Sequence, residues 1–321
     1  FEYRRDWIRD RLEFLASVFG VDCLTYTVMS NHIHVVLRSR PDVVQAWSDD
    51  EVARRWWRLF PQRKDDQGNP LEPSESDLSM IVNNPTRLAQ VRERLSDISW
   101  WMRCTAENIA RRANREENKT GRFWEGRYKA QLLLDEASLL ACSMYVDLNP
   151  IRAAMAPSPE KSDFTGAKDR IDDLKQREGS EKEQRSKPTR QWERSRRRAS
   201  SGWLAPIEIN EQSDPVGPDV NNEGRRSSNK GFLPLSLAKY LDLLDWTGRQ
   251  MRSAKRGSIP AELAPILKRI GVDSSGWCDL VSKFGRFFKR AAGNRESLAG
   301  EASRRSQNFM QAPGLAVFAN C

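Results

Sequence analysis

Several features that would place a protein in a familiar class are missing from this sequence of 321 residues. No apolar run approaches the roughly 18–20 residues that a membrane-spanning helix needs, which excludes an integral membrane protein. No Gly-x-x-x-x-Gly-Lys phosphate-binding loop occurs, and the opening residues do not resemble a secretory signal. The 5 cysteines are scattered without a CxxC pair, which argues against a zinc finger or a disulfide framework and favours a reducing compartment.

Negative charge is also in the minority, since 44 Asp and Glu face 53 Lys and Arg, giving a formal net charge of +9. This balance favours a polyanionic partner without identifying it. Hydrophobic residues make up 38% of the chain and charged residues 30%, so part of the chain is expected to be solvated linker or tail. The length fits one large domain or two ordinary ones.

Hydrophobic periodicity predicts the elements of the first half of the chain. The region from 42 to 120 is predicted to be helical, interrupted by a loop rich in Pro, Gly, Asp and Asn at 61–76. Within this region, one helix is expected at 96–114. Outside this region, helices are expected at 4–19 and 136–148, and strands at 23–29, 32–38 and 122–133.

The composition changes at about residue 156. Residues 157–230 are rich in Ser, Pro, Gly, Asn, Glu and Arg and poor in apolar residues, so we predict a charged, mostly disordered linker. A small helical module is expected at 231–292, where leucines recur at helical spacing, and a weakly patterned tail at 293–321.

Histidine, which can bind metal ions or transfer protons, occurs only twice in the sequence. Both residues, His32 and His34, lie in one predicted strand. Side chains alternate across a strand, so the two imidazoles face one way while Ile33, Val35 and Leu37 face the other. Two neutral imidazoles at this spacing can hold one divalent metal ion. The alternative is that one histidine packs or caps a turn and the other is incidental.

A tyrosine and an asparagine lie at the end of the predicted helix 136–148. Tyr145 and Asn149 are four residues apart, so a hydroxyl and an amide oxygen face the same way if the last turn is helical. The alternatives are a half-buried packing tyrosine and an asparagine that caps the helix before Pro150.

Three segments, in order along the chain, resemble the hallmark segments of a known family. They are Met29-Ser-Asn-His-Ile-His34, Phe123-Trp-Glu-Gly-Arg-Tyr-Lys129 and Tyr145-Val-Asp-Leu-Asn-Pro-Ile-Arg-Ala153. They are similar to those of the single-tyrosine HUH transposases, and more closely to the REP-associated tyrosine transposase branch of these insertion-sequence enzymes. The resemblance covers residues 1–156, which would form the catalytic domain with a helical insertion at about 42–95.

The resemblance implies an α+β fold, a ferredoxin-like or RRM-like antiparallel sheet with packed helices, to which the C-terminal helical module would be added. It implies that His32 and His34 bind a divalent metal ion, Mg²⁺ or Mn²⁺, that Tyr145 is the nucleophile, and that Asn149 is the third, polar ligand. Three departures stand out: the family's opening strand is absent unless the natural protein starts earlier, the stretch 42–95 is longer than usual, and Ser30 stands where the family often has Pro.

Candidate contacts to DNA come from the middle segment and from the end of the last one. Cationic side chains would contact phosphates and aromatic ones would stack on bases, although a strand with core aromatics and solvated cations fits equally well. Arg152 would clamp a phosphate or close a salt bridge. The candidates are Arg122, Trp124, Arg127, Tyr128, Lys129 and Arg152.

The resemblance therefore implies a transposase that cleaves and rejoins single-stranded DNA at hairpin-flanked sites through a 5′-phosphotyrosine. Two alternatives stay open: a domesticated hairpin DNA-binding protein without strand transfer, and a replication-initiator or relaxase-type HUH nickase. Relatives occur as monomers and as dimers, so a homodimer also stays open. The expected location is the bacterial cytoplasm, in association with the nucleoid and away from membranes.

Overall fold

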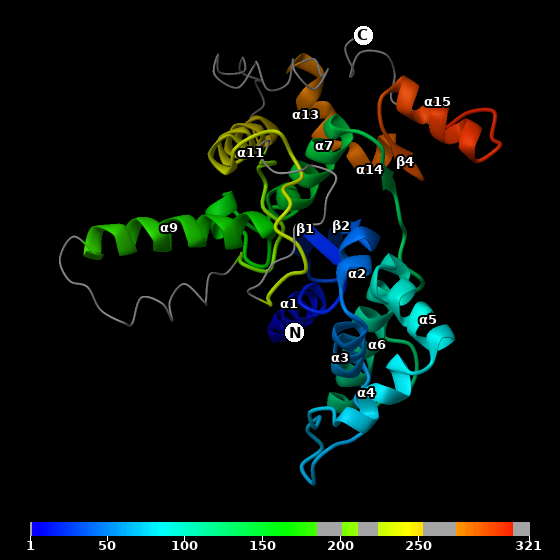
Figure 1. Ribbon diagram of the computed structural model, residues 1–321. Coiled ribbons are helices and arrows are strands. Elements are labelled where there is room, and N and C mark those ends of the chain that lie inside the picture. Colours follow the sequence, from blue (N-terminus) through cyan, green and yellow to red (C-terminus); the bar gives the residue numbers. More distant parts are fainter. Residues whose placement is uncertain (1, 185–200, 211–223, 253–273, 311–321) are drawn as a thin grey trace.

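A computed structural model describes residues 2–184, 201–210, 224–252 and 274–310 (Figure 1). None of its described helices is long and apolar enough to cross a membrane. Its elements, in chain order, are α1 (Tyr3–Ala16), β1 (Val21–Val28), β2 (Ile33–Ser39), α2 (Pro41–Ala46), α3 (Asp49–Leu59), α4 (Glu75–Val82), α5 (Pro85–Leu95), α6 (Ile98–Glu116), β3 (Leu132–Leu133), α7 (Glu136–Asp147), α8 (Asn149–Arg152), the 3₁₀ turn η1 (Pro159–Lys161), α9 (Gly166–Gln184), α11 (Leu237–Arg252), α13 (Ser274–Ser282), α14 (Phe284–Phe287), β4 (Ala291–Ala292) and α15 (Arg295–Arg304).

The structure is of the predicted α+β class, and an antiparallel hairpin of β1 and β2 lies at its centre. The register runs from Val21 opposite Ser39 to Val28 opposite Ile33, and every residue of β1 is buried. The hairpin confirms the two strands expected at 23–29 and 32–38, and α1, α6 and α7 confirm three of the expected helices within a few residues.

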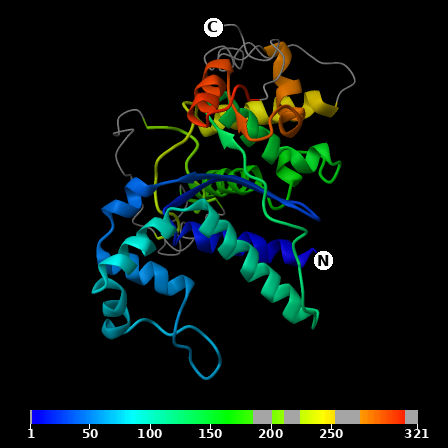
Figure 2. The same cartoon turned by 90° about the vertical axis from the view of Figure 1, so that its right-hand side faces the viewer.

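The two faces of the hairpin enter different hydrophobic cores. Ile33 and Val35 pack with α1 and α6, whereas Val36 packs with α7. His34 belongs to the same alternate set as Val36, so its face, expected to be open, is covered by α7 instead. Figure 2 shows the blue hairpin with the dark-blue helix α1 below it and green helices above it.

The region between β2 and β3 is helical, as predicted, and its helices begin at well-formed caps. Ser48, Asn84 and Asp97 each accept a backbone N–H of the helix that follows, and Ser74 forms a capping box with Asp77. These caps divide the region into α2 to α6, which Figure 1 shows together on one side of the hairpin.

The strand predicted at 122–133 is wrong for most of its length. Residues 117–131 form no regular element, and Leu132–Leu133 alone pair, in parallel, with Ala291–Ala292 of β4. The physical reason is burial: residues 125–130 are all exposed, so this stretch has no apolar face to cover.

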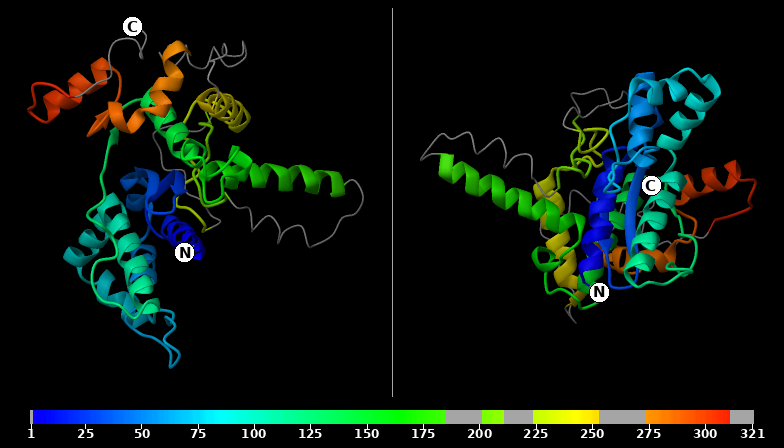
Figure 3. Two further views of the ribbon diagram at one scale, coloured as in Figure 1. Left: turned by 180° about the vertical axis from the view of Figure 1, so that it is seen from behind. Right: turned by 90° about the horizontal axis from the view of Figure 1, so that it is seen from below.

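The expectation of a mostly disordered linker at 157–230 also differs from the structure over the described residues. Helix α9 extends from the body of the protein (Figures 1 and 3), and Arg170 on it donates hydrogen bonds to the carbonyl oxygens of Leu24 and Ala205. The Trp203 side chain is fully buried, with its ring 5.0 Å from that of Tyr26. A few large anchors and buried polar contacts therefore order a segment whose average composition is polar.

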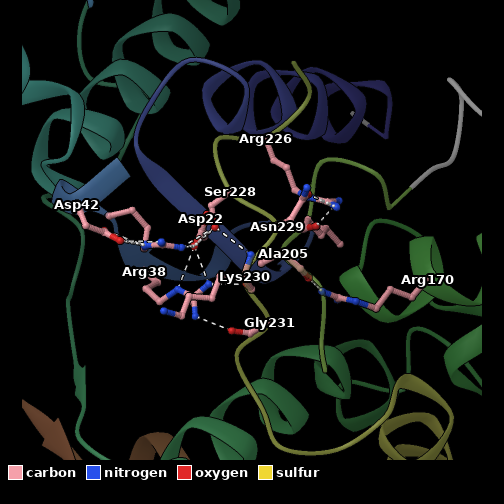
Figure 4. A network of polar contacts seen from close by, with 12 residues as sticks. Asp22, Arg38, Asp42, Arg170, Ala205, Arg226, Ser228, Asn229, Lys230 and Gly231 are labelled. Carbon is pink, nitrogen blue, oxygen red and sulfur yellow. Dashed lines mark hydrogen bonds and ion pairs between the residues drawn. The ribbon is translucent and has the colours of Figure 1, made fainter. Parts of the chain in front are cut away.

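Residues 226–231 are attached to the hairpin by charged groups (Figure 4). Arg38 pairs with the buried Asp22 at 2.7 Å and donates to the carbonyl oxygens of Lys230 and Gly231. Arg40, also buried, donates to Ser228 at 2.5 Å. These contacts tie a distant part of the chain to β1 and β2.

The C-terminal helices do not form a core of their own. Leu243 on α11, Trp277 on α13 and Phe284 on α14 are buried in the same cluster as Leu140 and Met144 of α7. The helical character expected within 231–292 is present in its described part, but this part packs on α7. The expected tail at 293–321 contains α15, and residues 311–321 lie outside the described part.

Candidate active site

The two histidines lie at the turn end of the hairpin. His34 is in β2, opposite Thr27, and is half-buried, while His32 lies just before β2 and is exposed. Their ring centroids are 4.9 Å apart in a T-shaped arrangement. The Nδ1 atom of His32 is 2.7 Å from Oδ1 of Asn31, a contact that fixes the orientation of the ring. The two imidazoles therefore lie side by side, as the strand periodicity predicts.

Tyr145 reaches the same place from α7. This helix begins with a capping box formed by Asp135 and Ser138, and it ends at Asp147. The half-buried Tyr145 ring has its centroid 5.6 Å from that of His34, again edge to face. A phenol and two imidazoles from segments more than a hundred residues apart are thus brought together.

Of the residues that follow Tyr145, Arg152 contacts the tyrosine ring directly. Arg152 places its guanidinium carbon 4.1 Å from the Tyr145 ring centroid, a cation–π contact. Asn149 starts α8, is only 6% exposed, and has no hydrogen-bond partner for its Nδ2 within the described residues.

Burial and neighbouring charge keep both imidazoles neutral near pH 7. Desolvation, the adjacent His32 and the cation of Arg152 lower the pKa of His34 to about 4. Desolvation and Arg152 also lower the pKa of His32. A neutral imidazole offers a nitrogen lone pair, which is the form that binds metal ions. The Arg152 charge also gives the site an attraction for an anionic phosphate.

The described residues contain no group of three or more His, Cys, Asp or Glu side chains that could hold a metal ion. A site here therefore requires a ligand of another kind beside His32 and His34. The nearly buried Asn149 amide is a chemically suitable oxygen donor, and a phosphate oxygen of the substrate is another. The two imidazoles therefore supply two of the ligands that a divalent ion needs, and Asn149 and the substrate are candidates for the others.

The remaining predicted DNA contacts lie on the irregular segment before β3. Arg122, Arg127 and Lys129 are exposed. The indole N–H of Trp124 donates to the Ala106 carbonyl oxygen at 2.9 Å and its ring packs in the core of α1 and α6, so this aromatic has a structural role. Tyr128 is 40% exposed and donates to the Ser99 hydroxyl.

One residue of the site was missed by the sequence reasoning. Asp147, two positions after Tyr145, is fully buried and accepts hydrogen bonds from Thr25, Tyr240 and the Ala167 backbone N–H. Its carboxylate therefore joins α7 to β1, α9 and α11, which fixes Tyr145 against the hairpin. An acidic residue on the helix face that also carries Leu140 and Met144 was the signal that could have found it.

Comparison with protein-family models, with curated proteins and with solved structures found no match to this chain.

Proposed function

We propose that this protein is a metal-dependent DNA strand transferase of the single-tyrosine HUH transposase type, acting on single-stranded DNA. The observation that carries the proposal is the convergence of Tyr145 with His34, at 5.6 Å between ring centroids, and of His34 with His32, at 4.9 Å. These are the residues that the family resemblance implies as nucleophile and metal ligands, and they come from separate elements of the fold.

The arrangement of elements supports a ferredoxin-like or RRM-like palm as part of the same proposal. Helices α1 and α6 pack together against one face of the β1–β2 hairpin, while α7 carries the tyrosine on the other face. Apart from α2–α5, which fall in the expected insertion, the order α1–β1–β2–α6, followed by the separate tyrosine helix α7, corresponds to the middle of such a palm.

In the proposed reaction, the Tyr145 oxygen attacks the phosphorus of a DNA phosphodiester. The bond between Tyr145 and phosphorus forms as the bond between phosphorus and the 3′ oxygen breaks, so the phenol loses a proton and the departing oxygen gains one. Arg152 attracts the phosphate toward Tyr145, and His32, His34 and Asn149 would hold the divalent ion. That ion, when bound, stabilises the negative charge that develops on the phosphate.

Trapping the covalent intermediate tests the proposal. The full chain is incubated with a 3′-labelled library of single-stranded hairpins and Mn²⁺ or Mg²⁺, and labelled protein is sought on a denaturing gel. We expect an adduct that Tyr145→Phe abolishes, while that variant still binds the hairpins. Tyr3→Phe, at an exposed tyrosine bonded to Glu116, is the matched control and should keep the adduct.

Two results would contradict the proposal. An undiminished adduct with Tyr145→Phe would remove Tyr145 from the chemistry. Hairpin binding by the unaltered protein without any adduct, with either metal, would instead support the domesticated DNA-binding alternative.

A further inference from the structure

A segment outside the family resemblance packs directly on the candidate tyrosine. The fully buried Phe284 ring of α14 has its centroid 6.1 Å from that of Tyr145. A Cβ atom added to Gly285 would lie 3.4 Å from the Tyr145 hydroxyl oxygen, so the α14 backbone passes close to the proposed nucleophile. Figures 1 and 3 show α14 beside α7 from opposite sides of the molecule. Whatever reaches the Tyr145 hydroxyl must therefore pass near α14.

The same short segment presents three exposed cations to solvent, Arg286, Lys289 and Arg290. Across the described residues, none of the three has an acidic partner, although the Lys289 ammonium donates to the Gly285 carbonyl oxygen at 3.2 Å. Lys283, a few residues earlier, does pair with Asp279. Unpaired cations gathered within five positions favour an anionic partner over internal stabilisation.

Pairing of β3 with β4 extends this cationic surface. The Leu132 N–H donates to the Arg290 carbonyl oxygen at 2.9 Å, so the segment that ends at Leu132 runs beside the segment that ends at Arg290. Lys129, one of the sequence-predicted phosphate contacts, is exposed three residues before Leu132. Two stretches more than 150 residues apart thus run side by side, and each carries exposed cations.

We infer that residues 284–290 form a second DNA-binding element, in which Arg286, Lys289 and Arg290 contact the phosphates of single-stranded DNA that leads to Tyr145. The inference rests on the proposed function for the identity of the anion. The inference goes beyond the proposed function because it gives the C-terminal part of the chain a direct role in substrate binding. This part of the chain has no counterpart in the family resemblance. The buried Phe284 anchors this element, and the exposed cations bind the strand.

Three double variants test the inference in the full chain. Binding of a fluorescent single-stranded oligonucleotide is measured by anisotropy as salt is varied, without metal. At about 0.15 M salt, Arg286→Gln with Lys289→Gln should weaken binding about tenfold and make the slope of log K against log salt shallower by about 1.4, since each single-strand phosphate contact contributes about 0.7.

Two further variants separate a local effect from a loss of net charge or of fold. Lys64→Gln with Arg87→Gln removes the same charge from exposed positions on the loop before α4 and on α5, and should bind within about twofold of the unaltered protein. Arg286→Lys with Lys289→Arg keeps the charge and should also retain binding.

Three outcomes would overturn the inference: unaltered binding by the Arg286 and Lys289 glutamine variant, an equal loss in the Lys64 and Arg87 variant, or no single-stranded DNA binding by the unaltered protein. The covalent-adduct assay reports on the proposed function separately. An adduct formed without any contribution of Arg286 and Lys289 to binding would refute the inference alone, and binding that depends on them without an adduct would refute the strand-transfer proposal alone.

Discussion

Replacing Asp147 by alanine is expected to lower the free energy of unfolding by about 3–4 kcal/mol. The Asp147 carboxylate accepts from the hydroxyls of Thr25 and Tyr240, each at 2.6 Å, and all three side chains are fully buried. Leaving a buried hydroxyl without its acceptor costs about 1–3 kcal/mol, and the Ala167 N–H loses its 3.2 Å bond as well. Burial raises the pKa of Asp147, so relief of its desolvation offsets part of this loss.

Urea unfolding, monitored by circular dichroism, measures the change in the free energy of unfolding. The slope m of this free energy against urea concentration is compared between variants. Asp147→Asn should cost less, because an amide keeps the shape and can still pair with Thr25 and Tyr240. The control is Asp245→Ala on α11, which removes an exposed pair with Arg249 and should change stability by about 0.5 kcal/mol or less. A loss below about 1 kcal/mol for Asp147→Ala would refute the idea that this carboxylate fixes α7 on the hairpin.

Three further predictions concern metal binding, pH and backbone packing. Changing His32 and His34 to Ala should abolish both Mn²⁺ uptake by calorimetry and adduct formation; metal-dependent cleavage by this variant would contradict their assignment. Burial raises the pKa of Asp169 to about 6, so the folded state holds this proton more tightly and stability should fall by up to about 3 kcal/mol as the pH rises from about 4 to about 6. Asp169→Asn should flatten that decline, and an unchanged pH profile would disprove the shift. A Cβ on Gly231 would lie 1.9 Å from the Glu208 carbonyl oxygen, so Gly231→Ala should destabilise by about 1–3 kcal/mol in thermal unfolding, whereas Gly300→Ala, with open space around it, should not.

Local signals in the sequence predicted the elements that carry the candidate site. The alternation of His34 with Ile33 and Val35, and the helical spacing over 136–148, correctly placed His34 on a strand and Tyr145 on a helix, whereas His32 lies just before the strand. Such patterns depend on neighbouring residues only, which is why they can be read without a fold.

The segment around Gly126 shows where this reasoning fails. Its aromatic and basic residues are typical of a strand, but a strand needs a partner and a face to bury, and both depend on the rest of the chain. Residues 201–209 show the opposite error, because a linker was predicted where the structure is ordered. The average composition of the region is polar, but Trp203 within it is buried against β1.

By itself, the sequence determined the two strands of the hairpin, the helix that carries Tyr145 and the proximity of His32 to His34, since each follows from periodicity over a few residues, whereas the α+β class was expected from the family resemblance. The tertiary structure alone decided that Tyr145 meets His34, that Asp147 joins four elements, and that α14 passes the tyrosine hydroxyl. These contacts join residues that lie far apart in the chain, and they form only when long-range burial brings α7 and the C-terminal helices into one hydrophobic core.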